Sequence, residues 1–257
     1  MSENLDPISV ARRLQGLDLF FVTPRLLAGL FSLEIGQGYA LVDRLETHGL
    51  VRKVEKGKYL LLGLEPERVL SNPFFIATQL ATPSYVSFWS ALHHYGLAEQ
   101  VPQAVLVATT QKKRPVAFDG HRFQFVTLKP HKFFGYEREP LGGLPVLMAD
   151  KAKALLDSLG QPRYAGGIAE VAHSLALALP DLDLRLLIEY ANRVQDRSLA
   201  SRLGFLLECL GASVDGLAIS ISPVLLDPTG GVVTTYNGHW RVRVNRTQDE
   251  LFAQGVG

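Results

Sequence analysis

The sequence predicts an α+β fold in two domains, residues 1–65 and 66–257. Helix-start signals and helical hydrophobic spacing alternate along the chain with short β-branched or aromatic runs and turn pairs. The chain has 257 residues, more than an average single domain, and the stretch 63–73 is rich in turn-forming residues. Hydrophobic residues make up 47% and charged residues 20%, which is typical of a folded globular protein.

Three helices are expected in the first domain. Two begin where an N-cap residue precedes a proline, at Asp6-Pro7 and Thr23-Pro24. They should end near Leu14 and Leu30. Ser32 is expected to cap the third helix, IGQGYALVDRLETH, which ends at His48-Gly49. Gly36 and Gly38 weaken its first turns by about 1 kcal/mol each relative to alanine.

A tight basic hairpin follows these helices. The residues LVRKV, EKGK and YLLL read as two short strands, and Gly57 supplies the positive φ that the turn needs. Three helices followed by a hairpin predict a winged helix-turn-helix. In that arrangement the third helix enters the DNA major groove and the hairpin, or wing, lies along the phosphate backbone.

The charge distribution agrees with DNA binding by this domain. The whole chain has a net charge of +1, so any preference for a polyanion must be local. Cationic side chains on the wing would release counterions from DNA and give affinity that is independent of sequence. The candidates for phosphate contact on the wing are Arg52, Lys53, Lys56 and Lys58.

Base contacts should come from the third helix and further phosphate contacts from the second. With Leu41 and Leu45 inward, Gln37 and Arg44 are expected to point outward, where they could pair with adenine and guanine. Tyr39 completes the candidate set on this helix. Thr23 and Arg25, at the start of the second helix, are placed to touch phosphate. Two alternatives stay open: a solvated basic hairpin without a ligand, and a winged helix that contacts protein.

The second domain should be mixed. Asn72-Pro73 and Thr82-Pro83 are expected to open two helices, the second being SYVSFWSALHHYG. Residues 104–109 and 144–148 read as strands, and Asp119-Gly120 reads as a type I′ hairpin turn. Four helices are expected at about 150–159, 167–179, 183–194 and 198–210. A final hairpin is expected to turn at Asn237-Gly238, with Trp240, Val242 and Val244 on its buried face.

Catalytic patterns are scarce. The sequence lacks a P-loop, an H-E-x-x-H helix and a G-x-S-x-G elbow, and no acidic residue is followed two positions later by lysine. The histidines lack ligand spacing. We therefore expect no enzyme, no cofactor and no metal. One match stays as an alternative: Gly166-Gly167 with Asp181 and Asp183 formally fits a nucleotidyltransferase, whose two carboxylates on one strand bind Mg²⁺. Helical periodicity after Pro180 instead favours helix-capping roles for both aspartates.

Residues 111–138 combine seven Lys/Arg with six aromatic side chains. Such a run could contact nucleic acid or an acidic protein. We favour core positions for the aromatic residues, which are Phe118, Phe123, Phe125, Phe133, Phe134 and Tyr136. The role of the charges stays open.

The composition also indicates in which cellular compartment the protein is located. The single cysteine, Cys209, excludes an internal disulfide and suits a reducing cytosol. The N-terminus has no secretory pattern, and no apolar run is long enough to span a bilayer. A cytoplasmic location without membrane contact is expected.

Four stretches together resemble the AbiEi family, the antitoxins of AbiE-type (type IV) toxin–antitoxin systems. They are TPRLLAGL, HGLVRKVEKGKYLL, PSYVSFWSALHHYGL and the stretch from LPVLMADKAKALLDSL through GGIAEVAHSL, of which YVSFWSALHHYGL is the most specific. The resemblance covers residues from about 20 to 210. It implies an N-terminal winged helix that binds repeats in the protein's own promoter and represses it. It also implies a C-terminal domain that counters a nucleotidyltransferase toxin, without a stable complex between the two proteins. The family includes solitary members without a toxin neighbour, and the glycine-interrupted third helix departs from good helix chemistry.

Overall fold

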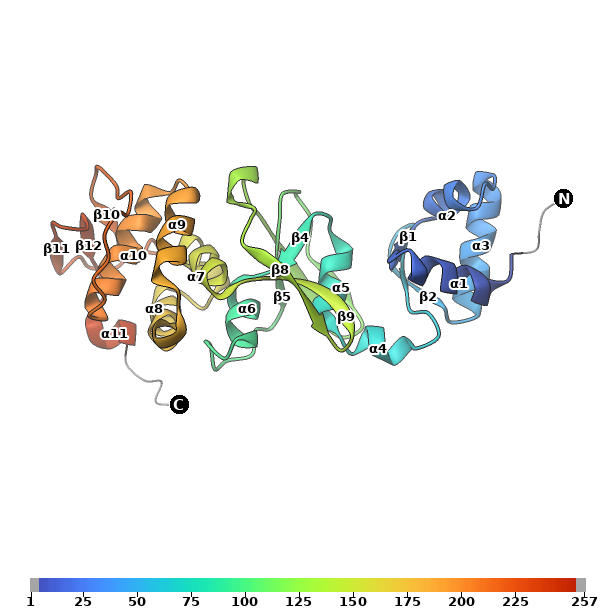
Figure 1. The fold of residues 1–257 in the computed structure, drawn as a ribbon, viewed down its shortest axis with the longest axis horizontal. Helices are drawn as coiled ribbons and strands as arrows, with labels where there is room; N and C mark the ends of the chain where they lie inside the picture. The colour runs from blue at the N-terminus through green and yellow to red at the C-terminus, as the bar shows by residue number, and fades with distance from the viewer. Residues whose placement is uncertain (1–4, 253–257) are drawn as a thin grey trace. The chain divides into compact units, whose positions relative to one another are not determined.

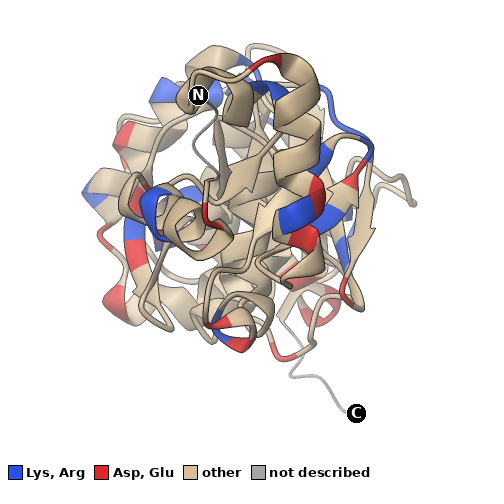
Figure 2. Cartoon of the chain, turned by 90° about the vertical axis from the view of Figure 1, so that its right-hand side faces the viewer, with Lys and Arg blue, Asp and Glu red and all other residues tan. Residues whose placement is uncertain are grey.

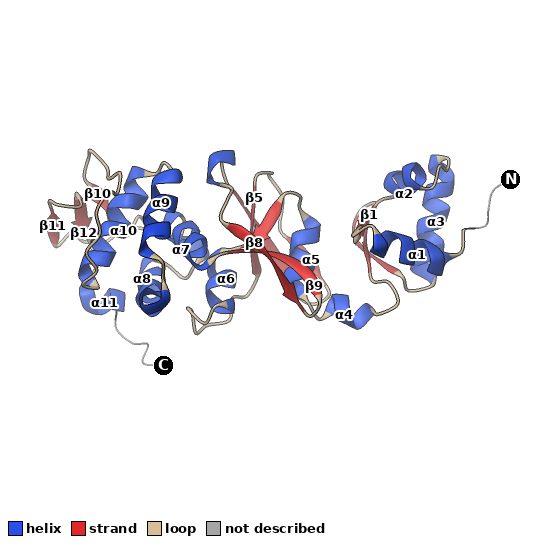
Figure 3. Ribbon diagram, viewed as in Figure 1, coloured by secondary structure: helices blue, strands red, loops and turns tan. Residues whose placement is uncertain are grey.

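The computed structural model describes residues 5–252, which form a mixed α+β fold with three sheets (Figures 1 and 3). This confirms the predicted α+β class. The chain divides into two compact units. The first contains the chain up to Thr82 with Ala117–His121 and Pro140–Val146, and the second contains the remainder.

The first unit begins with three helices and a small antiparallel sheet. The helices are α1 (Pro7–Gly16), α2 (Pro24–Leu30) and α3 (Ile35–Thr47). The strands are β1 (Phe21–Val22), β2 (Val51–Glu55) and β3 (Lys58–Leu61), in the order β1-β3-β2. The expected caps of the first two helices are confirmed, because Asp6 accepts from the Ser9 amide at 2.9 Å and Thr23 from the Leu26 amide at 3.1 Å.

The expected cap of α3 was wrong. Ser32 does not cap this helix, because it lies at a φ of +52° in the turn that ends α2. There the Leu33 amide donates to the Ala28 carbonyl at 2.8 Å, a C-terminal capping bond of the Schellman type. The N-cap of α3 is Glu34, whose own amide donates to Oε1 of Gln37 at 2.9 Å. The end of α3 is as predicted, with His48 at the C-cap and Gly49 at a φ of +69°.

Two layers of apolar side chains hold the first unit together. One lies among the three helices and the inner face of the sheet, and it includes Leu14, Leu27, Leu41, Leu45 and Leu61. The other lies beyond β3, where Leu60 is fully buried. The ring of Phe20, just before β1, meets Phe75 of the segment after the hairpin edge-on, with 4.8 Å between centroids.

Two further helices, α4 (Pro66–Leu70) and α5 (Pro73–Leu80), belong to the first unit. The start of α5 is as predicted, since Asn72 accepts from the Phe75 amide at 2.9 Å. The stretch 63–73, expected to be a turn-rich boundary, contains α4. Pro66 at the first helical position is compatible with this short helix.

The main sheet of the second unit has six strands in the order β6-β7-β5-β4-β9-β8. The strands are β4 (Ser84–Val86), β5 (Val105–Thr109), β6 (Val116–Phe118), β7 (His121–Thr127), β8 (Tyr136–Leu141) and β9 (Leu144–Ala149). The tips of its two hairpins are assigned to the first unit. The type I′ turn is confirmed, because Asp119 and Gly120 have φ values of +49° and +77°.

The segment SYVSFWSALHHYG was expected to be one helix, and this was wrong. Its first residues form β4, which pairs with β5 on one side and β9 on the other. A short, fully buried apolar run of this kind fits a central strand as well as a helix. The helix α6 (Phe88–His94) starts only after the strand.

Four helices pack beyond the sheet, close to the predicted ranges: α7 (Lys151–Gly160), α8 (Ile168–Ala178), α9 (Leu184–Arg193) and α10 (Arg197–Cys209). Short 3-10 turns, η1 (Pro130–Lys132), η2 (Pro162–Tyr164) and η3 (Leu179–Asp181), connect elements of this unit. In Figure 1, α7 lies beside the sheet, and α8, α9 and α10 lie beyond it.

A second, three-stranded sheet closes the described chain. It consists of β10 (Val224–Leu225), β12 (Val242–Val244) and β11 (Thr235–Asn237), in that order, followed by α11 (Gln248–Phe252). The predicted two-residue turn at Asn237-Gly238 was wrong, because Asn237 pairs with Val242 and residues 238–241 form the connection. The predicted buried face is confirmed: Trp240, Val242 and Val244 are all buried.

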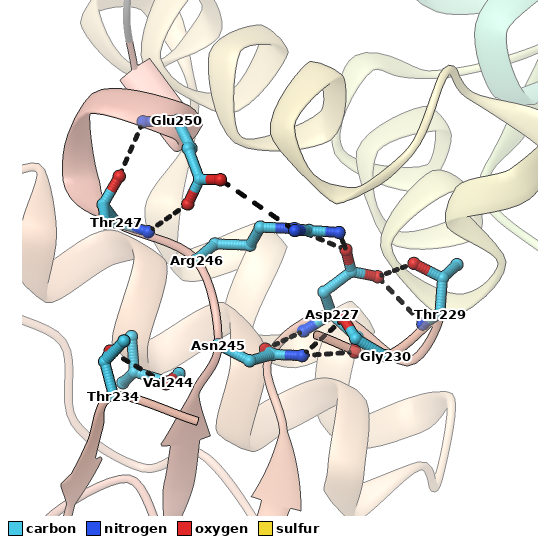
Figure 4. A network of polar contacts seen from close by, with 9 residues as sticks. All are labelled: Asp227, Thr229, Gly230, Thr234, Val244, Asn245, Arg246, Thr247 and Glu250. Carbon is cyan, nitrogen blue, oxygen red and sulfur yellow. Dashed lines mark hydrogen bonds and ion pairs between the residues drawn. The ribbon is translucent and has the colours of Figure 1, made fainter. Parts of the chain in front are cut away.

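A polar network around Asp227 fixes the loop between β10 and β11 (Figure 4). The Asp227 carboxylate accepts from the Thr229 hydroxyl at 2.6 Å and from Nε of Arg246 at 2.7 Å. The amide of Asn245 donates to the carbonyls of Asp227 and Gly230, both at 2.9 Å. These bonds join the loop to the residues after β12.

Across the helices of residues 5–252, none combines the length and the apolar character needed to cross a membrane.

Candidate nucleic-acid interface

The basic hairpin, residues 51–61, consists of β2, β3 and the turn between them. Glu55 pairs with Lys58, so Lys56 and Gly57 form the turn. Gly57 has a φ of +70°, as the sequence predicted, and nothing lies within 4 Å of the position where a Cβ would be. The pairing is irregular between Lys53 and Glu55, which adds local twist to the strand.

The four cationic side chains of the basic hairpin fall into two pairs. Lys53 and Lys56 are exposed, and neither has an ion-pair partner within the part of the chain that the structure describes. Arg52 lies 2.5 Å from the Asp119 carboxylate and over the ring of Phe118. Lys58 lies 3.3 Å from the Glu55 carboxylate. Only the first pair presents uncompensated charge to an incoming phosphate.

The candidate residues of α3 do not share one flank of the helix. At 3.6 residues per turn, residues seven apart nearly coincide, whereas residues two apart are separated by about 200°. Gln37 and Arg44 therefore lie on one flank, and Tyr39 lies on the other. Gln37 and Tyr39 are exposed, but Arg44 is half buried. The Gln37 side chain also has a local role, since its Oε1 accepts the N-cap amide of Glu34.

The middle of the exposed face of α3 carries small and acidic residues. Gly36 and Ala40 are exposed there, followed by Asp43 and, toward the Tyr39 flank, Glu46. Burial raises the pKa of Tyr59 in β3, and the carboxylates of Glu46 and Asp43 raise it further. The acidic residues of α3 therefore lie near the basic hairpin and reduce the positive potential at that end of the helix.

Gly38 allows α3 to pack closely against α2. A Cβ at this position would lie 2.4 Å from the Pro24 carbonyl oxygen and 3.0 Å from the Ala28 Cβ. The absence of a side chain lets α3 cross α2 closely. Gly36, by contrast, has nothing within 4 Å of its Cβ position. Of the two glycines, only Gly36 leaves room for another molecule to approach the backbone.

The two candidates at the start of α2, Thr23 and Arg25, differ in how available their side chains are for a phosphate contact. The Thr23 hydroxyl accepts from the Leu26 amide and so acts as the helix cap. Arg25 is exposed, with no ion-pair partner among residues 5–252.

The charges of the chain as a whole are mixed: in Figure 2, Lys and Arg segments alternate with Asp and Glu segments. The sequence had no signal for the Arg52–Asp119 pair, because 67 positions separate the two residues.

The second unit contains a buried ionic cluster that the sequence analysis missed. Lys153 of α7 is fully buried and donates to the Asp157 carboxylate one turn further on. Asp157 also accepts from the hydroxyls of Tyr85 at 3.1 Å and Ser87 at 2.8 Å. The Lys153 ammonium lies 5.1 Å from the Phe134 ring centroid. Burial, with the Asp157 charge, raises the pKa of Tyr85 well above its ordinary value, so its hydroxyl stays a donor.

The aspartates of the nucleotidyltransferase alternative do not share a strand. Asp181 ends the turn η3, and Asp183 is the N-cap of α9, where it accepts from the amides of Arg185 at 2.9 Å and Leu186 at 3.1 Å. The capping role expected for both aspartates is confirmed for Asp183 and wrong for Asp181, which lies within η3. In addition, no cluster of three or more His, Cys, Asp or Glu suited to a metal ion occurs within residues 5–252.

The aromatic residues of the run 111–138 belong mostly to the core, as expected. Phe118, Phe123, Phe125 and Phe134 are buried, and Phe133 and Tyr136 are half buried. The last two pack against Tyr85, with ring centroids 4.9 and 4.7 Å away. They therefore line the buried cluster, in agreement with the core positions favoured from the sequence.

Comparison with solved structures gave a match over most of the chain. The crystal structure of the RV2827C protein from Mycobacterium tuberculosis aligns with a TM-score of 0.56 and 15% sequence identity. The alignment covers 91% of this chain and 89% of that one. No family model matches the sequence, and no curated protein does so either. The likeness to the RV2827C protein concerns the fold and extends over both units.

Proposed function

We propose that the first unit is a winged helix that binds double-stranded DNA, with α3 in the major groove and the basic hairpin as the wing. The observation that carries the proposal is the pair of exposed, unpaired lysines of the basic hairpin, Lys53 in β2 and Lys56 in the two-residue turn. A lysine without an internal partner breaks no ion pair when it moves to a phosphate. Arg52 and Lys58 would first have to leave Asp119 and Glu55.

The contact with α3 should centre on its first two turns. Gly36 and Ala40 allow a close approach, whereas the carboxylates of Asp43 and Glu46 disfavour phosphate near the end of the helix. Gln37 and Arg44 lie together on one flank and are the better candidates for base contacts. In a bidentate contact with adenine, the Gln37 Oε1 would accept from the base with the lone pair that the Glu34 amide does not use. Tyr39 would meet the other wall of the groove.

The wider proposal is a cytoplasmic transcriptional repressor that acts as the antitoxin of a type IV toxin–antitoxin system. It is supported by the four stretches that resemble the AbiEi family, including the hairpin and YVSFWSALHHYGL. The DNA partner would be repeats in the protein's own promoter. The functional partner would be a nucleotidyltransferase toxin encoded nearby, countered by the second unit without a stable complex. On this proposal the protein is not an enzyme.

Gel-shift titration on the protein's own upstream region at several salt concentrations tests the proposal. Lys53→Ala/Lys56→Ala should weaken binding by a similar factor on operator and on unrelated DNA. Each lost phosphate contact should reduce the slope of log K against log salt by about 0.9. The matched control, Lys112→Ala/Lys129→Ala, removes two exposed lysines from the second unit and should leave the slope unchanged. Equal slopes for the two double variants would remove the basic hairpin from the interface.

One observation favours a second candidate, a winged helix that contacts protein. Ile35 and Tyr39 are 52% and 56% exposed on one flank of α3, next to Glu46. An apolar and acidic flank of this kind suits a protein partner more than DNA. Absence of any shift on the upstream region, at low salt, would favour this candidate.

A further inference from the structure

A pocket of about 480 Å³ lies within the second unit, formed by the start of α6, strands β5 and β7, and the turn η2. Its lining includes Trp89, Gln103, Leu106, Gln124, Arg163 and Tyr164. This volume falls within the range of small-molecule sites, about 300–1,000 Å³. No residue of the basic hairpin takes part, so the pocket is independent of the proposed DNA contact.

The sheet and two glycines shape the pocket. Leu106 of β5 and Gln124 of β7 are register partners in a parallel pair, so their side chains share one face of the sheet. The indole of Trp89 packs against the Gly166-Gly167 loop. A Cβ on Gly166 would lie 3.2 Å from Cη2 of that ring, and the φ of +74° also favours glycine. The ring of Tyr164 is held by an edge contact with Phe88, at 5.7 Å between centroids.

Several polar groups of the lining have no partner inside the protein. Nε1 of Trp89 is buried and donates to no acceptor among the described residues. The side chains of Gln103, Gln124 and Arg163 likewise have no hydrogen bond or ion pair within residues 5–252. The Arg163 guanidinium only stacks on Tyr164, 4.6 Å from the ring centroid. Of these groups only the Trp89 donor is buried, and a buried donor without an acceptor is rare in folded proteins. Gln103 and Arg163 are exposed and Gln124 is half buried, so their polar groups are free to reach a bound molecule. The buried donor beside three unpaired polar side chains points to a ligand.

The chemistry of the lining defines that ligand. It has flat aromatic surfaces, two amides that both donate and accept, one cation, and no carboxylate. Aromatic side chains stack on nucleobases, amides pair with base edges, and a guanidinium binds phosphate in a planar fork. An apolar ligand would use neither the amides nor Arg163, and a neutral sugar would leave the cation unused.

We propose that this pocket binds a nucleoside phosphate, with the base against Trp89 and Tyr164 and the phosphate on Arg163. The same chemistry is offered by a free mononucleotide and by the terminal nucleotide of a single strand. The two sources differ only in whether further nucleotides are attached to the sugar–phosphate.

The two tryptophans of the chain provide the measurement. Their indole N–H resonances are recorded on the full chain during titration with each of the four ribonucleoside 5′-monophosphates, with short single-stranded oligonucleotides, and with inorganic phosphate. The Trp89 resonance should shift in a saturable manner. The Trp240 resonance should stay fixed, because its Nε1 donates to the Glu208 carboxylate at 2.6 Å. The variant Trp89→Phe assigns the two signals.

Arg163→Ala should weaken binding at least about tenfold, the loss expected for a charge-assisted phosphate contact. Arg185→Ala removes an equally exposed arginine from α9 and should bind as the parent does. A shift with mononucleotides supports a free nucleotide as ligand, and a shift with oligonucleotides alone supports a strand end. The proposal would be overturned if the Trp89 resonance did not move with any probe, or if inorganic phosphate shifted it as much as a nucleotide does. Unchanged nucleotide affinity in Arg163→Ala would also overturn it.

Discussion

Gly36 and Gly38 are two residues apart in α3 and meet opposite surroundings. A methyl group on Gly38 would collide with the Pro24 carbonyl, a backbone atom that cannot move without displacing α2. A methyl group on Gly36 would meet open space. From the sequence both glycines read as weak points of the helix. The structure shows that packing requires glycine at position 38, whereas alanine at position 36 would fit and would favour the helix.

Gly38→Ala should lower the free energy of unfolding by about 1–3 kcal/mol, the usual cost of overpacking. Gly36→Ala should raise it by up to about 1 kcal/mol, because alanine is the better helix former. Urea denaturation of both variants measures the two effects. If DNA approaches the backbone at Gly36, the more stable variant should also bind its operator more weakly. A stabilised Gly38→Ala would show that α2 yields freely, contrary to the packing argument.

Lys153 carries the second residue-scale prediction. Lys153→Met leaves the Asp157 carboxylate buried with only the Tyr85 and Ser87 hydroxyls as donors. Removing one partner of a buried ion pair typically costs about 3–5 kcal/mol. The control, Lys151→Met, lies on the same helix at a half-buried position and should stay within about 0.5 kcal/mol of the parent. Equal denaturation midpoints for the two variants would contradict the assignment of the pair as a stabilising contact.

At the residue scale, local chemistry was predictable from the sequence and distant partners were not. A two-residue turn forces its lysine into solvent, so the exposure of Lys56 followed from the pattern. The pairing of Arg52 with Asp119 did not, because nothing local links a strand residue to a turn 67 positions away. The cap at Glu34 had a usable signal, since Gln37 three residues later is the spacing of a capping box.

At the element scale, helices with clear caps were predicted to within a residue or two, and ambiguous apolar runs were not. Strand β4 is three residues long and wholly buried, so neither alternation nor helical periodicity can distinguish its state. The turn after β11 was placed too early, because the sequence Asn-Gly is a strong local signal that strand pairing overrides. Ser32 was misassigned because one serine can end one helix or begin the next.

The network around Asp227 holds the last elements of the described chain and depends on pH. Burial raises the pKa of Asp227, but hydrogen bonds from Thr229 and Arg246 outweigh this effect, so the pKa lies below the ordinary 3.8. A carboxyl group with a lowered folded-state pKa stabilises the fold at every pH above its unfolded pKa. That contribution disappears as the pH falls through the folded-state pKa.

Asp227→Asn should therefore lower the free energy of unfolding at neutral pH by about 1–3 kcal/mol, the range for hydrogen bonds to a charged group. The difference from the parent should shrink as the pH falls below about 4. Urea denaturation across this pH range measures it. Asp215→Asn changes an exposed carboxylate and should follow the parent at every pH. A deficit in Asp227→Asn that stays constant with pH would show that the charge of Asp227 is not what stabilises the loop.

At the scale of the whole molecule, the sequence predicted two parts, and the extent of the first can be tested by truncation. The inner core of the first unit is built from residues before position 65, among them Leu14, Leu41 and Leu61. These residues are not the whole of the first unit, because the ring of Phe20 packs edge-on against Phe75 of α5. A boundary at 65 leaves Phe20 without this partner, whereas one at 82 retains α4 and α5.

A fragment of residues 1–82 should therefore have a higher urea midpoint than a fragment of residues 1–65. Its free energy of unfolding should be larger by at least about 2 kcal/mol. That is the contribution expected from reburying one large apolar side chain. Phe75→Ala in the longer fragment removes the ring opposite Phe20 and should abolish most of the advantage. Both fragments keep Lys53 and Lys56, so the longer one should bind DNA with the salt slope of the full chain if the first unit carries the whole interface. Equal midpoints for the two fragments would mean that α4 and α5 add nothing to the stability of the three helices and the hairpin.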